Sequence, residues 1–68
     1  MEYLYGEEIE VRIDREGLGQ NVGVAHLPDE TMVVIAGAGG RVGESIHATI
    51  VGMEKTPIGL SFLANACQ

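Results

Sequence analysis

Hydrophobic and polar residues alternate most regularly near the start of the chain, over residues 7–14. In the run EEIEVRID, Ile9, Val11 and Ile13 fall on one side of an extended backbone, and charged residues fall on the other. A period of two predicts a β-strand with one buried face. On a helix the same three residues would scatter over a wide arc, so a strand is the better interpretation.

Four later segments also favour extended structure. VGVAHL and TMVVIA are separated only by the short turn PDE, which predicts a hairpin. SIHATIV and IGLSFL alternate like half-buried strands, and the final ANACQ is expected to be a tail. Five short strands without a convincing helix predict an all-β fold, a small five-stranded antiparallel barrel, because closing the sheet removes its exposed edges. The four segments span residues 22–27, 31–36, 45–51 and 58–63.

The length of 68 residues sets the scale of the domain. It allows one small domain, which we predict to span residues 1–68. The ends, residues 1–6 and 64–68, are expected to fray. Because the aromatic residues are only Tyr3, Tyr5 and Phe62, the core must be built mainly from aliphatic side chains.

A glycine-rich stretch, MVVIAGAGGRVGESI, resembles the start of a dinucleotide-binding fold. Gly37, Gly39 and Gly43 give the spacing G-x-G-x-x-x-G, which is looser than the G-x-G-x-x-G fingerprint. Only residues 44–48 separate Gly43 from the next apolar run, whereas a parallel crossover needs a dozen or more residues. We therefore predict a glycine-rich connection between two antiparallel strands, and no cofactor.

The charge balance is acidic, with ten acids against four bases and a net charge of −6. This balance argues against a basic nucleic-acid clamp and against binding to anionic membranes. No apolar run approaches a membrane span, and the N-terminus does not look like a secretory signal. The single cysteine fits a reducing compartment, so a cytoplasmic location is expected.

Residues capable of metal binding or catalysis are few. His26, His47 and Cys67 lack the spacing of a structural zinc site, so no metal is expected. Ser45 and Ser61 lie in no nucleophile elbow. The acids of residues 7–16 fit a solvated strand face better than a catalytic pair. The sequence therefore predicts no enzyme.

The motifs EEIEVRI, VGVAHL, DETMVVI, RVGESI and KTPIGLSFLA, taken in this order, resemble a TRAM domain. The chain looks most like the version at the C-terminus of bacterial PIN–TRAM proteins, and the resemblance covers nearly all of it. It implies a five-stranded barrel of OB-like character. It also implies an RNA-binding accessory module, with an attached or partner nuclease or RNA-modifying domain.

The family's binding surface uses the glycine loop after the first strand and nearby basic or aromatic positions. Glu44 and Leu60 occupy positions where the family pattern suggests lysine and arginine, so weak and salt-sensitive binding of single-stranded or structured RNA is expected. Carried over to this sequence, the resemblance implies RNA contacts at Arg15, Gly17, Gly19, His26, Arg41 and Lys55.

A second hypothesis follows from the charge. An acidic strand face and a strand that is apolar on both sides would also suit a protein-interaction or oligomerisation domain with no nucleic-acid role. Self-association into a homo-oligomer is part of this alternative.

Overall fold

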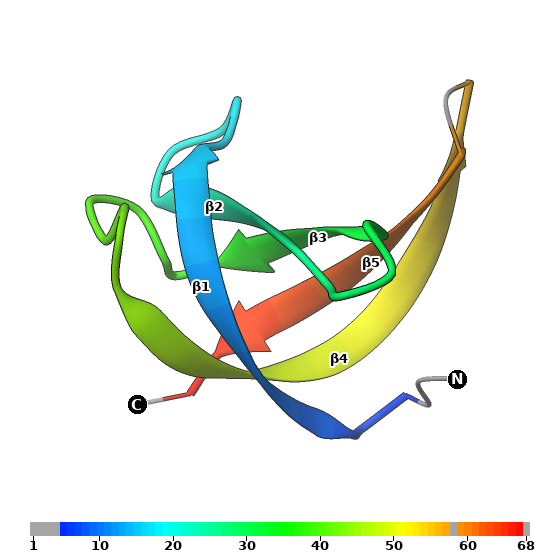
Figure 1. Cartoon of the computed structure of the whole chain (residues 1–68), viewed down its shortest axis with the longest axis horizontal. Coiled ribbons are helices and arrows are strands. Elements are labelled where there is room, and N and C mark those ends of the chain that lie inside the picture. The colour runs from blue at the N-terminus through cyan, green and yellow to red at the C-terminus, as the bar shows by residue number, and fades with distance from the viewer. Residues whose placement is uncertain (1–4, 58, 68) are drawn as a thin grey trace.

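The computed structural model describes residues 5–57 and 59–67, and within them five β-strands form one sheet (Figure 1). No helix in this part of the chain could cross a membrane. The ends were expected to fray, but residues 1–4 and 68 lie outside the described part of the chain. Ile58 also lies outside it. The strands are β1 (Glu8–Glu16), β2 (Val22–His26), β3 (Met32–Ala36), β4 (Ser45–Thr56) and β5 (Gly59–Ala66).

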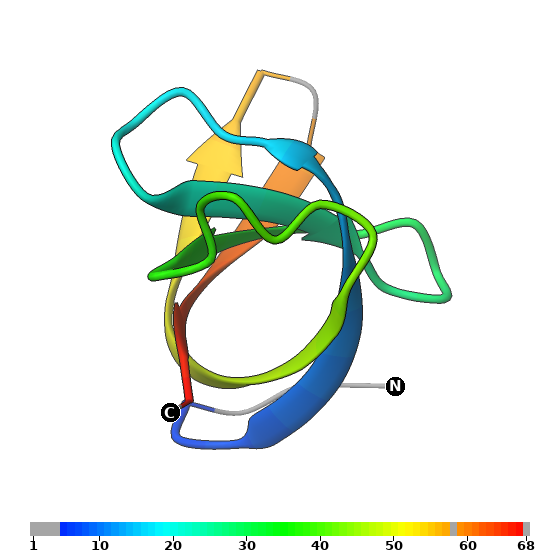
Figure 2. The same cartoon turned by 90° about the vertical axis from the view of Figure 1, so that its left-hand side faces the viewer.

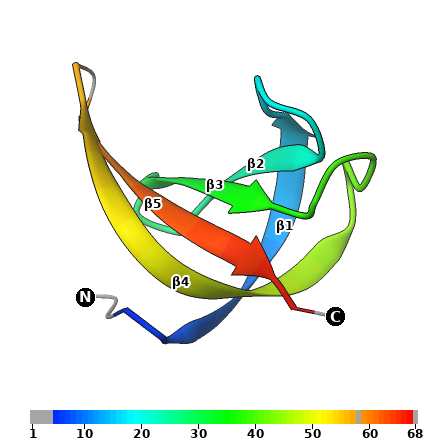
Figure 3. The same cartoon turned by 180° about the vertical axis from the view of Figure 1, so that it is seen from behind.

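The sheet closes on itself in the order β1-β2-β3-β5-β4, with β4 pairing back onto β1. The predicted hairpin is confirmed, because β2 and β3 pair antiparallel from Val22↔Ala36 to His26↔Met32. β3 and β5, however, run parallel and lie side by side in Figure 3. The prediction of an antiparallel sheet throughout is therefore wrong. An odd number of strands in a closed ring cannot alternate direction everywhere, so at least one neighbouring pair must be parallel.

The core lies inside the ring and follows the predicted alternation. Each strand turns every second side chain inward, as the pleat requires. In β1 the inward residues are Ile9, Val11 and Ile13, and the partner strand β4 contributes Ile46 and Ala48 in register with them. Five more side chains of the core are fully buried: Ala25, Val33, Ile35, Ala38 and Ile50.

The last two strands are longer than the sequence indicates. β4 continues past residue 51 to Thr56, and β5 continues past residue 63 to Ala66. Residues 64–66, expected to belong to a fraying tail, pair with β4, and Ala64 is buried against Ile35 and Ile50. An alanine has too short a side chain to stand out as a core residue in the sequence.

The loop of residues 37–44 crosses one end of the ring, from β3 to β4 (Figure 2). Ala38 in this loop is fully buried and belongs to the core. The two strands that it joins run in opposite directions but are not neighbours, because β5 lies between them. The predicted glycine-rich connection does join two strands of opposite direction, and it does so by crossing the end of the ring past β5.

Candidate nucleic-acid interface

The outer surface of β2 and β3 carries two neighbouring pockets, which share Arg15 and Met32. One extends toward the loop of residues 17–21, which we call the β1–β2 loop, and the other toward the β4–β5 hairpin. In Figure 1 this loop and the tip of the hairpin rise on the same side of the molecule, with β2 and β3 between them. We call this surface the β2–β3 face.

A β-bulge explains why Arg15 reaches this face. β1 pairs with β2 at Ile13↔Ala25 and then at Arg15↔Val24, so Asp14 is an extra residue on β1. Ile13 and Ala25 face the core, and one residue later the register has shifted. In a regular strand, residues two apart point to the same face, so without the bulge the Arg15 side chain would point into the core like that of Ile13. With it, both Asp14 and Arg15 are exposed on the outside.

Two acids flank Arg15 in the sequence, and each has another partner. The Asp14 carboxylate lies 2.8 Å from Nδ1 of His26, and the Glu16 carboxylate accepts a 2.6 Å hydrogen bond from the Gly40 backbone N–H. Within the described part of the chain, Arg15 makes no ion pair. Its guanidinium is therefore available to an external anion.

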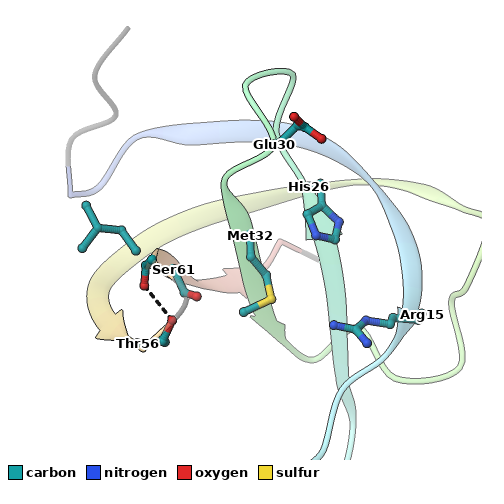
Figure 4. A pocket seen from close by; sticks show the side chains of 8 residues that line it. Arg15, His26, Glu30, Met32, Thr56 and Ser61 are labelled. Atoms are coloured by element: carbon teal, nitrogen blue, oxygen red, sulfur yellow. Dashed lines mark hydrogen bonds between the residues drawn. The ribbon is translucent and has the colours of Figure 1, made fainter.

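His26 lies at the end of β2, and its side chain is 44% exposed. The contact with Asp14 fixes one ring nitrogen, which orients the imidazole on the same face as Arg15. Figure 4 shows His26 and Arg15 on one side of Met32, and Thr56 and Ser61 on the other. The ring therefore borders the pocket rather than packing in the core.

The β1–β2 loop holds Gly17 and Gly19 close to Val22. A Cβ added at Gly17 would lie 2.5 Å from Val22 Cγ1, and one added at Gly19 would lie 3.3 Å from Val22 Cγ2. The Gly17 N–H also donates to the Val22 carbonyl oxygen at 2.8 Å. Leu18, between the two glycines, is fully exposed and lines a pocket. The glycines thus let the loop fold tightly while it presents an apolar side chain to solvent.

The β1–β2 loop is fastened to the glycine stretch of the 37–44 loop. Asn21 accepts from the Gly37 N–H through its backbone oxygen at 2.8 Å, and from the Gly39 N–H through Oδ1 at 3.1 Å. The Gly40 N–H donates to Glu16, as described above. Backbone N–H groups that would cradle a phosphate in a dinucleotide fold are therefore already bonded within the chain, which provides a structural explanation for the glycine-rich sequence.

The predicted RNA-contacting residues are only partly brought together. Arg15, Gly17 and His26 line the two pockets, and Gly19 lies in the same loop as Gly17. Lys55 lines neither of these two pockets but pairs with Leu60, which lines one of them. Arg41 lies in the 37–44 loop, half-buried and in neither pocket.

Sequence reasoning missed the residues on β3, β4 and β5 that complete the pockets. Met32 is paired with Ser61, and both lie on the outer side of the sheet because their neighbours Val33 and Phe62 pack toward the core. The parallel register of β3 and β5 is what brings Met32 and Ser61 together, and no short motif encodes it. The missed residues on these strands are Met32, Val34, Thr56, Gly59, Leu60 and Ser61, and Glu30, between β2 and β3, lines the same pocket as Ser61.

The two pockets are small and open. Their volumes are about 170 and 280 Å³, below the roughly 300–1,000 Å³ of typical small-molecule sites. Within residues 5–57 and 59–67, no three or more His, Cys, Asp or Glu side chains are grouped to hold a metal ion. The face is therefore better suited to an extended polymer than to an enclosed small molecule.

The outer face of β1 and β4 carries a separate group of acids. Glu8 and Glu10 each lie 3.5 Å from a ring nitrogen of His47, and all three side chains are more than half exposed. Cys67 lies beside them, with its sulfur 3.2 Å from the Thr49 hydroxyl. The acids of β1 are thus displayed away from the β2–β3 face, apart from Asp14 and Glu16.

Comparison with known proteins finds one informative similarity. The chain is 33% identical over 61 residues to an uncharacterized PIN and TRAM-domain containing protein, YacL, from Bacillus subtilis (strain 168). The match covers 90% of this chain and 17% of the length of that relative. No protein-family model matches the sequence, and no solved structure matches it significantly.

Proposed function

We propose that this chain is a TRAM-like module that binds RNA weakly through its β2–β3 face. The observation that carries the proposal is the placement of an unpaired Arg15 beside His26 on a face bordered by the β1–β2 loop and the β4–β5 hairpin. In OB-folds, the face of strands 2 and 3 and these same two loops bind oligonucleotides. The similarity to a PIN and TRAM-domain protein points to the same class of ligand.

The proposed contacts are of two kinds. Arg15, Lys55 and Arg41 neutralise backbone phosphates, while His26, Met32 and Leu18 offer ring and apolar surfaces to bases. The net charge of −6 opposes a polyanion, so affinity is low and depends strongly on salt. Three phosphate contacts on a single strand correspond to a loss of roughly twentyfold in affinity between about 50 and 200 mM salt.

The proposal gives the chain no catalytic activity and no cofactor. It acts in the cytoplasm as an accessory domain, and an attached or partner nuclease or RNA-modifying domain performs any chemistry on the RNA; the B. subtilis relative names a PIN domain beside its TRAM domain. The OB-like character of the ring, with the order β1-β2-β3-β5-β4, belongs to the same proposal.

Titration of a labelled single-stranded RNA, followed by fluorescence anisotropy at low salt, tests the proposal. Arg15→Ala should weaken binding several-fold, and Arg41→Ala and Lys55→Ala should weaken it less. Arg12→Ala is the matched control, because Arg12 pairs with Ser45 on the β1–β4 face and should leave affinity unchanged. A flat titration of the parent protein at high protein concentration would contradict RNA binding.

A protein-interaction or oligomerisation function is favoured by a different observation. Val51, Met53 and Leu60 are each about half exposed near the β4–β5 hairpin. Exposed apolar side chains that form a contiguous patch are typical of contacts with another protein. Light scattering of the purified chain would detect self-association, and substitution of Met53 by a charged residue should abolish it if this function is correct.

A further inference from the structure

The two ring nitrogens of His26 have different surroundings. Nδ1 lies 2.8 Å from the Asp14 carboxylate, whereas Nε2 has no hydrogen bond among the described residues. An ionised carboxylate only accepts hydrogen bonds, so the single proton of the neutral ring must be on Nδ1. The neutral ring therefore presents Nε2 to a ligand as an acceptor.

Protonation of His26 changes Nε2 from an acceptor to a donor. A phosphate oxygen is itself an acceptor, so Nε2 of the neutral ring cannot bind it, while the N–H of the charged ring can. The same proton gives the ring a positive charge that offsets the Asp14 carboxylate. Histidine is the side chain that ordinarily changes charge between pH 5 and 8. The state of this ring thus decides whether it attracts or repels an RNA strand.

Charged groups from two segments surround the His26 ring. Asp14 and Arg15 come from β1, and Glu30 comes from the turn between β2 and β3. The other residues that line this pocket are uncharged: Met32, Thr56, Gly59, Leu60 and Ser61. With the ring neutral, two carboxylates accompany one guanidinium, which disfavours a polyanion. With the ring charged, two cations match the two carboxylates, and the local field no longer opposes RNA.

We propose that protonated His26 binds an RNA phosphate together with Arg15, so that the affinity of the β2–β3 face for RNA rises as pH falls. The inference rests on the proposed RNA-binding function and names a group through which pH regulates it. Arg15 and His26 line one pocket and lie on the same side of Met32 (Figure 4). Because the ring is 44% exposed, its contact with a phosphate is that of a surface ion pair, and we expect a gain in affinity of about fivefold.

His47 provides the matched control. Its ring nitrogens each lie 3.5 Å from a carboxylate, of Glu8 and of Glu10, and its side chain is also exposed. Protonation of either histidine changes the net charge of the chain equally. His47 lies on the β1–β4 face, however, and lines neither of the two pockets. A comparison of the two histidines therefore separates a local phosphate contact from a general effect of charge.

Anisotropy titrations with labelled oligo-U at about pH 8 and about pH 5.5 test the inference across the range in which histidine titrates. The parent protein should bind about fivefold more tightly at the lower pH. The slope of log affinity against log salt should also be steeper there by about 0.7, as one more phosphate contact on a single strand requires. His26→Phe keeps an aromatic ring that cannot be charged and should lose both changes, whereas His47→Phe should retain them.

NMR titration of the two histidine rings in the parent protein is a second measurement that needs no variant. Binding and protonation affect each other reciprocally, so a fivefold change in affinity corresponds to a shift of about 0.7 pH unit. Saturating oligo-U should raise the midpoint of the His26 titration by this amount and should leave the midpoint of His47 unchanged.

The outcomes separate this inference from the function on which it rests. Affinity that does not depend on pH, a gain that survives in His26→Phe, or a His26 midpoint that RNA does not raise would overturn the inference while RNA binding stands. A gain lost equally in His47→Phe would indicate an effect of net charge and would overturn it too. No binding of oligo-U by the parent protein at either pH would remove both proposals.

Discussion

Gly39 is required by a close approach between two loops rather than by its backbone angles. A Cβ at this position would lie 2.5 Å from Asn21 Cα, a backbone atom that cannot move without the whole β1–β2 loop. Gly39→Ala should therefore cost about 2–3 kcal/mol in the free energy of unfolding, as severe overpacking does. Urea unfolding of the variant and the parent measures the difference.

Gly40→Ala is the control for this prediction. Gly40 has a φ of 76° but no atom within 4 Å of an added Cβ, so only left-handed backbone strain opposes the alanine. That strain is worth about 1–2 kcal/mol. A Gly39→Ala variant as stable as Gly40→Ala would show that the two loops are not packed as described.

Asp29 links stability to pH at the residue scale. The backbone N–H of Thr31 donates to its carboxylate at 3.0 Å, and this bond holds the pKa of Asp29 below its ordinary value. A lowered folded-state pKa contributes stability that is present above the unfolded-state pKa and is lost as pH falls through the folded one. The expected window is therefore acidic, below about pH 4.

NMR titration of the Asp29 carboxyl group measures this pKa directly. We expect a midpoint below the ordinary aspartate value, and a smaller loss of Tm on acidification in Asp29→Asn than in the parent. A midpoint at or above the ordinary value would contradict the turn geometry between β2 and β3.

At the scale of elements, the alternation of side chains was enough to predict the strands. Ile9, Val11 and Ile13 face the core as expected, and the hairpin of β2 and β3 forms where the PDE turn indicated it. The sequence could not show the bulge at Asp14, because a bulge shifts register without changing composition. The same bulge places Arg15 on the outside of the sheet. The alternation of hydrophobic and polar residues therefore could not predict that Arg15 belongs to the candidate site.

The candidate site could be predicted only in part. Arg15, Gly17 and His26 were chosen through the family resemblance, and they line the two pockets. Ser61 looked like an ordinary serine in an alternating strand. Its burial depends on the parallel pairing with β3, a contact between segments about thirty residues apart that local periodicity cannot encode.

Strand pairing also predicts where the ring opens most easily. β3 has partners on both sides, β2 and β5, and its Val33 and Ile35 side chains are fully buried. Beyond Ile50, β4 pairs only with β5 among the described residues. Local stability follows such pairing and burial, so the hairpin should open well before the ring does.

Amide hydrogen exchange followed by NMR checks this order. The amides of Val33 and Ile35 should exchange at rates set by global unfolding, and those of Met53 and Lys55 at least tenfold faster. Equal protection along the whole of β4 would contradict an open hairpin end and would require a further partner for that edge.

At the scale of the whole molecule, the acidic net charge is distributed unevenly. Glu8 and Glu10 cluster around His47 on the β1–β4 face, whereas Asp14 and Glu16 are bonded to His26 and to the Gly40 backbone. Arg15 makes no ion pair among the described residues, although Glu30 lines the same pocket and acids outnumber bases in the chain. An acidic protein can in this way hold a local surface for a polyanion, at the cost of affinity.

Chemical-shift mapping tests the central claim, that the β2–β3 face is the RNA-binding surface, most directly. A ¹⁵N-labelled sample is titrated with single-stranded RNA at low salt. We predict that the largest shifts fall on Arg15 and Gly17, on His26 and Met32, and on Ser61, while amides of the β1–β4 face, such as Glu10 and His47, stay unchanged. Shifts concentrated on the β1–β4 face, or absent throughout at saturating RNA, would contradict the account.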